Sequence, residues 1–358
     1  MKFAAAVFRN KQNPIRAVRF DLITDALLSG GVPLDEIVLL PYDDPNAVMG
    51  ALARLQKQFD GVFVICDPVL LPVAREAVSA TTGTHFSGDF LETENCLFAV
   101  ISADDEGKAL ISSKLVKAVD AKRGNSYHSV VIKTVYAPAA KLKKALRLAN
   151  EAAGGKLSVY ASEEFADGRI EVVYDNMTPK FTADEVVRIL ASELSGHVYA
   201  MEDVSIAERL FDVLKLHRLK LATAESFTGG GVGQAIVSVP GASRVFYEGL
   251  NTYSNASKAD RLGVTEYTLR SKGAVSNETA YEMAAGLLKT GRCDVAIATT
   301  GIAGPDSDGS GTPAGKCFIA VGTKERVRVF EYLLEGGREA VTKKAINLAL
   351  FLAYKEIK

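Results

Sequence analysis

The chain has few of the residues that build metal centres and disulfide frameworks. It contains four Cys and four His among 358 residues. The cysteines lack CxxC spacing and lie mostly in apolar strand-like segments, which is typical of reduced, buried thiols. The histidines show no ligand spacing, so we expect no His-based zinc site, no other metal and no cofactor. These residues are Cys66, Cys96, Cys293 and Cys317, with His85, His128, His197 and His217.

The chain also lacks an excess of charge and long apolar runs. Lys and Arg number 42 and Asp and Glu number 43, giving a formal net charge of -1 and no global electrostatic case for nucleic-acid binding. The basic cluster at 141–147 has the spacing of an amphipathic helix with a solvated face. No segment has the order of a signal peptide or the length of a membrane span. We expect a cytoplasmic protein without nucleic-acid or membrane partners.

The length suggests two or three domains, and the residue patterns predict three with mixed α/β folds. Residues 1–125 alternate helix-like and strand-like segments, which predicts a mostly parallel sheet with covering helices. Residues 126–203 predict a small α+β module, and residues 204–358 a second α/β domain. The expected helices are 18–28, 46–59, 138–152, 182–194, 232–237 and 340–354. The expected strands are 37–40, 61–66, 130–135, 156–160, 169–174, 197–200, 219–223, 294–300 and 316–322.

The most informative stretch is the turn at 223–231, which carries Ser226 between a strand and a helix. Such a turn lifts a hydroxyl oxygen out of the sheet edge, and the glycines behind it leave room for a substrate. Free N–H groups at the start of the helix can stabilise an anion. The alternative is that Ser226 and Thr228 cap the helix and the glycines only turn the chain.

Three further segments end strands in loops rich in Gly, Ser and Thr. The cluster 247–258 reads as a strand, a turn and a short helix that starts at Ser254 or Asn255. The segment 294–305 is a buried-looking strand that breaks into a glycine/proline loop, and the loop 306–315 precedes another strand. Several strands ending in such loops are typical of an open α/β sheet that builds a site beyond its strand ends.

Residues from about 204 onward resemble the C-terminal domain of the CinA (competence/damage-inducible) family, which implies nicotinamide-nucleotide amidase activity. The family usually has a small Cys where this chain has Phe227, so we expect altered packing there without lost chemistry. Five pieces carry the resemblance, in the family's order and spacing: Ala224-Glu225-Ser226 with Thr228-Gly229-Gly230, Val239-Pro240-Gly241-Ala242-Ser243, Tyr253-Ser254-Asn255 with Lys258, Gly273-Ala274-Val275-Ser276, and Thr300-Gly301-Ile302-Ala303-Gly304-Pro305.

The resemblance implies that Ser226 is the nucleophile, Lys258 the base, and Tyr253 a hydroxyl that relays or holds the proton. A lysine beside a serine is a known alternative to histidine. Lys258 must be neutral to accept a proton, which requires burial or a nearby positive charge to lower its pKa. The alternatives are a solvated surface lysine and an ordinary strand tyrosine that covers the core edge.

The resemblance also implies a set of substrate-binding groups. Thr300 and the loop from Gly301 to Gly304 place hydroxyl and N–H groups against the carboxamide or the ribose phosphate. Arg338 meets the phosphate by a forked contact, or is a solvated first-turn arginine. Glu225 orients Lys258 or binds a ribose hydroxyl, or is an acid favoured by the helix dipole. The remaining members are Thr228, Gly229 and Gly230.

The other two domains are similar to those of full-length CinA proteins, with departures. Residues 1–125 resemble a molybdopterin-binding-like domain, which the family links to ADP-ribose pyrophosphatase activity. At 7–11 and 66–70 the family's glycines are missing, so the backbone cannot approach a pyrophosphate closely, and Pro68 removes a donor. Residues 126–203 resemble a KH-like module but lack its GxxG loop. Gly154-Gly155 is more simply a helix C-cap.

We therefore expect a metal-independent amidohydrolase that converts nicotinamide mononucleotide and water to nicotinic acid mononucleotide and ammonia. A domain that builds its site from exposed loops often pairs, so we expect a homo-oligomer. One alternative is a bifunctional enzyme whose first domain cleaves a dinucleotide pyrophosphate. The other is a non-catalytic nucleotide-binding or DNA-uptake accessory protein.

The missing glycines give a test of the first domain. The full chain should release no AMP from ADP-ribose with any divalent metal, and removal of residues 1–125 should leave amidase activity intact. Metal-dependent release of AMP that is lost in Asp67→Ala would instead show that Asp43, Asp44 and Asp67 form a relocated metal site.

Overall fold

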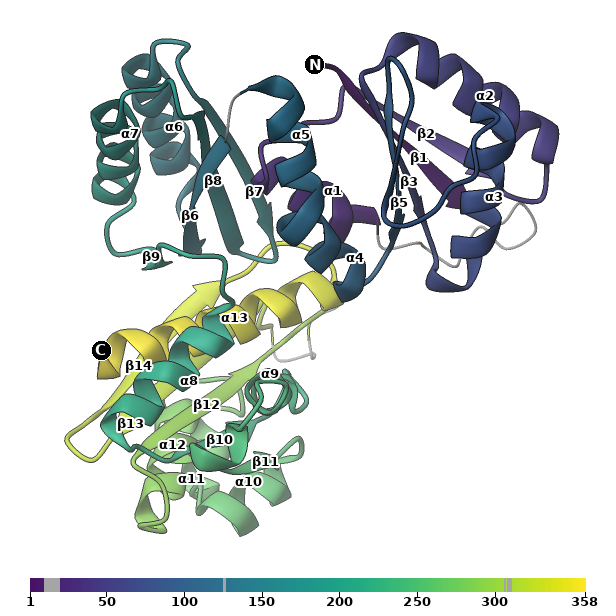
Figure 1. The fold of residues 1–358 in the computed structure, drawn as a ribbon. Helices are drawn as coiled ribbons and strands as arrows, with labels where there is room; N and C mark the ends of the chain where they lie inside the picture. The colour runs from purple at the N-terminus through teal and green to yellow at the C-terminus, as the bar shows by residue number, and fades with distance from the viewer. Residues whose placement is uncertain (10–19, 125–126, 306, 308–310) are drawn as a thin grey trace. The chain divides into compact units, whose positions relative to one another are not determined.

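The computed structural model describes residues 1–9, 20–124, 127–305, 307 and 311–358 (Figure 1). The chain divides into two compact units, one of residues 1–130, 150–159 and 171–187, the other of residues 131–149, 160–170 and 188–358. Three sheets lie along the chain, in agreement with the predicted multi-domain α/β class. The expected boundary at 125–126 falls outside the described residues, and the three-domain division stays a prediction.

The N-terminal sheet has the strand order β2-β1-β3-β5-β4. The first four are parallel and β4 is antiparallel to β5, which confirms the predicted mostly parallel sheet. Apolar side chains fill both faces, with α2 and α3 on one and α1 and α5 on the other. The strands are β1 (Phe3–Arg9), β2 (Glu36–Pro41), β3 (Gly61–Cys66), β4 (Phe90–Glu92) and β5 (Leu97–Ser102). The α-helices are α1 (Phe20–Ser29), α2 (Pro45–Gln58), α3 (Leu71–Thr82), α4 (Asp105–Leu110) and α5 (Val116–Arg123).

The second sheet has the order β7-β8-β6-β9. Helix α6 ends before Gly154 and Gly155, whose φ values of 55° and 75° confirm the predicted helix C-cap. The edge strand β7 is longer than predicted. Residues 161–164 are exposed, all but Ala161 are polar, and they show no apolar alternation that would predict a strand. The elements are β6 (Tyr127–Val135), α6 (Ala139–Ala153), β7 (Ser158–Glu164), β8 (Asp167–Asp175), α7 (Lys180–Glu193) and β9 (Val198–Ala200).

The C-terminal sheet has the order β11-β10-β12-β13-β14, with β10 parallel to both of its neighbours. Strands β13 and β14 continue it in antiparallel fashion. The strands are β10 (Leu221–Glu225), β11 (Phe246–Asn251), β12 (Val295–Gly301), β13 (Lys316–Thr323) and β14 (Val327–Leu333). The α-helices are α8 (Ile206–His217), α9 (Gly231–Val237), α10 (Asn255–Leu262), α11 (Glu266–Ser271), α12 (Asn277–Lys289) and α13 (Arg338–Ile357).

The register of this sheet brings three chain segments to one edge. The last residue of β10, Glu225, lies opposite Asn251 of β11 and Thr299 of β12. Because these strands are parallel, the residues that follow them leave the sheet at the same edge. Ser226 therefore emerges between the segment that leads to α10 and the loop that follows β12, which is the arrangement that the sequence predicted.

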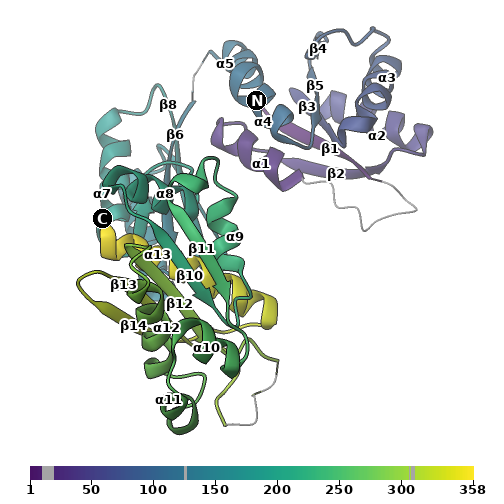
Figure 2. The ribbon, with the colours of Figure 1, turned by 90° about the horizontal axis from the view of Figure 1, so that it is seen from below.

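Helices cover both faces of the C-terminal sheet. Helices α8, α9 and α13 share one apolar core with it, and α8 lies beside α13 (Figure 1). Helix α12 covers the other face with side chains such as Met283 and Leu287 (Figure 2). Within the described ranges, no helix combines the length and apolar character that crossing a membrane requires.

The packing of α12 against α10 depends on a glycine. A Cβ atom on Gly286 would lie 2.1 Å from the main-chain oxygen of Leu262, a rigid neighbour that cannot move aside without shifting α10. The close approach of the two helices therefore excludes any side chain at this position.

This contact predicts opposite effects for two glycine-to-alanine changes in helices. Gly286→Ala should lower the free energy of unfolding by about 1–3 kcal/mol through overpacking. Gly50→Ala, where a Cβ meets nothing within 4 Å, should raise it by about 0.5–1 kcal/mol through lower backbone entropy of the unfolded chain. Thermal unfolding followed by circular dichroism measures both, and equal effects would contradict the close packing.

Candidate active site

The turn that carries Ser226 is fixed by main-chain hydrogen bonds. The Ser226 amide donates to the Thr299 oxygen at 3.0 Å, and the Gly229 amide donates to the Ser226 oxygen at 3.1 Å. The Ser226 side chain is buried, with 8 % of the residue exposed. The predicted strand–turn–helix is thus present, and it holds the hydroxyl at the carboxyl end of the central strand.

Glu225 organises the start of α9 and does not reach the cavity. Its carboxylate accepts hydrogen bonds from the Thr228 hydroxyl at 2.7 Å and from the amides of Gly230, Val232 and Gly233 at 3.1, 3.0 and 2.8 Å. A negative charge at a helix N-terminus is stabilised in this way. The expectation that these amides are free to stabilise a reacting anion is therefore wrong. Of the roles that the sequence allowed for Glu225, the structure shows the helix-terminal acid.

Thr228, Gly229 and Gly230 belong to the turn as well. The Thr228 hydroxyl also lies 2.7 Å from the Thr299 hydroxyl, which ties the turn to β12. Gly229 and Gly230 have φ values of 62° and 95°, in the left-handed region that favours glycine. None of the three is among the described residues that line the cavity beside Ser226, so the structure shows their role in shaping the turn, and their contact with a substrate stays a prediction.

Lys258 is buried against Ser226. It comes from α10. Ser254, one of the two predicted start residues, caps this helix by accepting a hydrogen bond from the Ser257 amide. The Lys258 residue is 1 % exposed. Its Nζ lies 3.0 Å from Ser226 Oγ, 2.9 Å from the Thr252 oxygen and 3.1 Å from the Tyr253 oxygen.

The surroundings of Lys258 favour its neutral form. Burial removes water from the charged amine and lowers the pKa of Lys258 to about 8. A neutral amine has two N–H bonds and one lone pair. The two main-chain oxygens accept the N–H bonds, which leaves the lone pair for the Ser226 hydroxyl hydrogen.

The contact of Tyr253 with Lys258 is made by its main chain and not by its hydroxyl. Its main-chain oxygen accepts from Lys258, whereas its side chain lines the cavity and the residue is 65 % exposed. In the described part of the chain no hydrogen bond joins its hydroxyl to Ser226 or Lys258. The proton-relay role of the hydroxyl stays a prediction.

The cavity beside Ser226 has a volume of about 280 Å³. It brings together seven of the predicted residues, namely Ser226, Tyr253, Lys258, Thr300, Gly301, Gly304 and Arg338. Its remaining lining residues were not assigned to the site from the sequence. Four of them, Ala274, Val275, Ile302 and Ala303, lie inside the pieces that carry the resemblance, and the fifth is Phe227, where the chain departs from the family. The lining therefore combines one serine, two basic side chains and an apolar wall.

Two of these groups are oriented by neighbouring loops. The Thr300 hydroxyl donates to the Ala274 oxygen at 2.6 Å, which ties the end of β12 to the segment before α12. The Arg338 guanidinium donates from Nη1 to the Gly304 oxygen at 2.9 Å. The planar fork of a guanidinium suits a phosphate or carboxylate.

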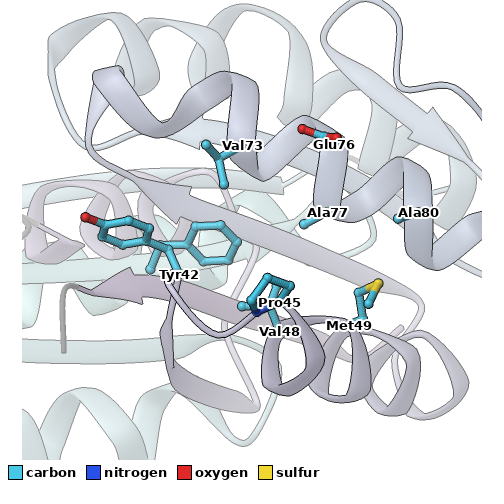
Figure 3. A pocket seen from close by; sticks show the side chains of 9 residues that line it. Tyr42, Pro45, Val48, Met49, Val73, Glu76, Ala77 and Ala80 are labelled. Atoms are coloured by element: carbon cyan, nitrogen blue, oxygen red, sulfur yellow. The ribbon is translucent and has the colours of Figure 1, made fainter.

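A second cavity, in the N-terminal unit, has a different character. It measures about 330 Å³ and is lined mainly by apolar side chains of α2 and α3, as Figure 3 shows. Glu76 is its one charged lining residue, and no serine or lysine accompanies it. The contact between Ser226 and Lys258 lies in the C-terminal cavity.

The turn after β3 in the first domain lacks the glycines that would let its backbone approach a phosphate, as the sequence predicted. The Asp67 carboxylate accepts the Val69 amide at 3.1 Å, and the Asp44 carboxylate caps α2 by accepting the Ala47 amide at 3.1 Å. Across the residues that the structure describes, His, Cys, Asp and Glu side chains do not gather in threes or more as a metal site would need. Asp43, Asp44 and Asp67 thus do not form the alternative metal cluster.

Comparison with known proteins identifies the C-terminal part. A competence-damage inducible protein of Caldicellulosiruptor saccharolyticus is 39% identical over 202 residues, which are 56% of this chain and 49% of that protein. A CinA-like protein of Chloroherpeton thalassium is 45% identical over 143 residues, 40% of this chain and 34% of that protein. A solved CinA superfamily protein of Enterobacter cloacae has 30% identity and a TM-score of 0.42, over 46% of this chain and 98% of that chain.

The chain spans less than half the length of these two curated relatives. The family model that matches is described as the CinA C-terminal domain, and it covers residues 203–357. This range contains Ser226, Lys258 and the whole lining of their cavity. The resemblance seen in the sequence is confirmed, and residues 203–357 of this chain belong to the CinA C-terminal domain family.

Proposed function

We propose that the C-terminal domain is a nicotinamide-nucleotide amidase, which hydrolyses the carboxamide of nicotinamide mononucleotide. The observation that carries this proposal is the buried Lys258 amine, 3.0 Å from the Ser226 hydroxyl in a cavity that also holds Arg338. Burying a lysine is costly unless its neutral form is used. A serine and a neutral amine in contact form a nucleophile and its base.

The acylation step follows from this contact. Ser226 Oγ attacks the carboxamide carbon while its proton passes to the neutral Lys258 amine. The tetrahedral intermediate then collapses, the carbon–nitrogen bond breaks, and Lys258 returns the proton to the leaving nitrogen, which departs as ammonia. The product is an ester between Ser226 and the nicotinoyl group.

The deacylation step uses the same base. Water attacks the ester carbon and gives a proton to Lys258, which passes it to Ser226 Oγ as the ester bond breaks. Nicotinic acid mononucleotide leaves as the carboxylic acid, which ionises by giving its proton to water, and Ser226 and Lys258 return to their starting forms. Every proton moves between Ser226, Lys258, water and the leaving group, so this chain's own residues complete the cycle.

The cavity supports a nucleotide substrate with an anionic end. Arg338 offers its guanidinium to the phosphate, and Gly301 and Gly304 let the main chain of their loop approach the substrate closely because neither has a side chain. A purely nucleotide-binding accessory role would leave the Ser226–Lys258 contact without a use. A homo-oligomeric state and a cytoplasmic location stay predictions.

Ser226→Ala tests the nucleophile. This variant should lose at least about 10³-fold in the rate of ammonia release from nicotinamide mononucleotide, because it removes the hydroxyl that contacts Lys258 Nζ. Binding of the mononucleotide should persist. Ser238→Ala, on the exposed side of α9, is the matched control and should keep the wild-type rate. Near-normal turnover in Ser226→Ala would refute the serine mechanism.

Lys258 predicts the pH dependence of the reaction. Because only the neutral amine accepts the proton, ammonia release should rise with pH and level off above an apparent pKa of about 8. Lys258→Met and Lys258→Arg should both be inactive, since a guanidinium stays protonated. Lys289→Met, at the exposed end of α12, should be normal. An active Lys258→Arg variant would mean that another group takes the proton.

A further inference from the structure

Phe227, the residue after Ser226, forms a rigid wall of the cavity. It lines the cavity and is 7 % exposed. The rest of the residue is buried in the apolar core that includes Val232, Ala303 and Val341, from α9, the loop after β12 and α13. A ring that is buried in a close-packed core has little freedom to move aside, so the substrate must fit against it.

The charges of the cavity lining bear on how a positively charged substrate ring could be bound beside Phe227. Among the lining residues that the structure describes, Lys258 and Arg338 are the ionisable cationic groups and none is Asp or Glu. The phosphate of the substrate can face Arg338, but the described lining offers no carboxylate to the positively charged pyridinium ring. Apart from hydroxyl and carbonyl oxygens, the groups with negative electrostatic potential are the faces of aromatic rings.

We propose that Phe227 is a specificity-determining residue that contacts the pyridinium ring of the substrate and favours its cationic form. The inference rests on the proposed function for the choice of substrate, and it adds which ring and which charge state the cavity selects. A small Cys, the usual residue of the family at this position, offers no such ring. The selection is therefore a property of this chain's own cavity.

The test compares two nucleotides that differ in the ring alone. Nicotinamide mononucleotide and its reduced 1,4-dihydropyridine form share the phosphate, the ribose and the carboxamide, but the reduced ring is uncharged and not aromatic. Their dissociation constants are measured by calorimetry on the full chain carrying Ser226→Ala, so that no turnover interferes. The oxidised form should bind more tightly.

Adding Phe227→Leu to this background should reduce the ratio of the two dissociation constants by about 3- to 10-fold, the range of a partly desolvated cation–π contact. Phe227→Tyr keeps an aromatic ring and should preserve the ratio. Phe211→Leu is the matched control, because Phe211 is also 7 % exposed and belongs to the same core but does not line the cavity. It should leave the ratio unchanged even if it lowers stability.

An unchanged ratio in Phe227→Leu, an equal fall in Phe211→Leu, or failure of both nucleotides to bind would overturn the proposal. The proposed reaction is judged separately, by ammonia release from the oxidised nucleotide with the wild-type chain. If the wild-type chain releases no ammonia but the ratio of dissociation constants still depends on Phe227, the proposed amidase reaction is refuted and the contact between Phe227 and the pyridinium ring stands.

Discussion

The contact between the buried Lys258 amine and the Ser226 hydroxyl is the interaction on which the rest of the site depends. It requires an apolar environment that lowers the pKa of the amine to about 8, and acceptors for its N–H bonds. The main-chain oxygens of Thr252 and Tyr253 supply those acceptors. The end of β11, the start of α10 and the turn after β10 must therefore be fixed relative to one another, so that Lys258 Nζ stays within hydrogen-bond distance of all three oxygens.

The topology of the sheet meets this requirement. Placing β10 between two parallel neighbours brings three carboxyl ends to one edge, and Glu225 then fixes the turn through four hydrogen bonds. A buried carboxylate in this position fully occupies the amides at the start of α9. The stabilisation of a reacting anion must come from other donors of the cavity, because these amides are already used.

The sequence predicted the parts of this site that local chemistry determines. The strand–turn–helix around Ser226 and the start of α10 followed from residue types and spacing, and the pairing of Ser226 with Lys258 followed from the resemblance to the family. The role of Glu225 did not, because side-chain direction at a turn depends on packing against neighbouring strands. For the same reason, the sequence could not predict that the Tyr253 ring is exposed and the Phe227 ring buried. The length of β7 was missed because its outer half has no apolar pattern.

The central claim is that Ser226 forms a covalent bond to the substrate. Acid quenching of the full chain during turnover of nicotinamide mononucleotide, followed by peptide mass mapping, measures this directly. The account predicts a nicotinoyl nucleotide ester on the peptide that contains Ser226, formed together with one equivalent of ammonia per chain in a rapid first phase. An adduct on any other residue, or the same rapid ammonia release from Ser226→Ala, would contradict it.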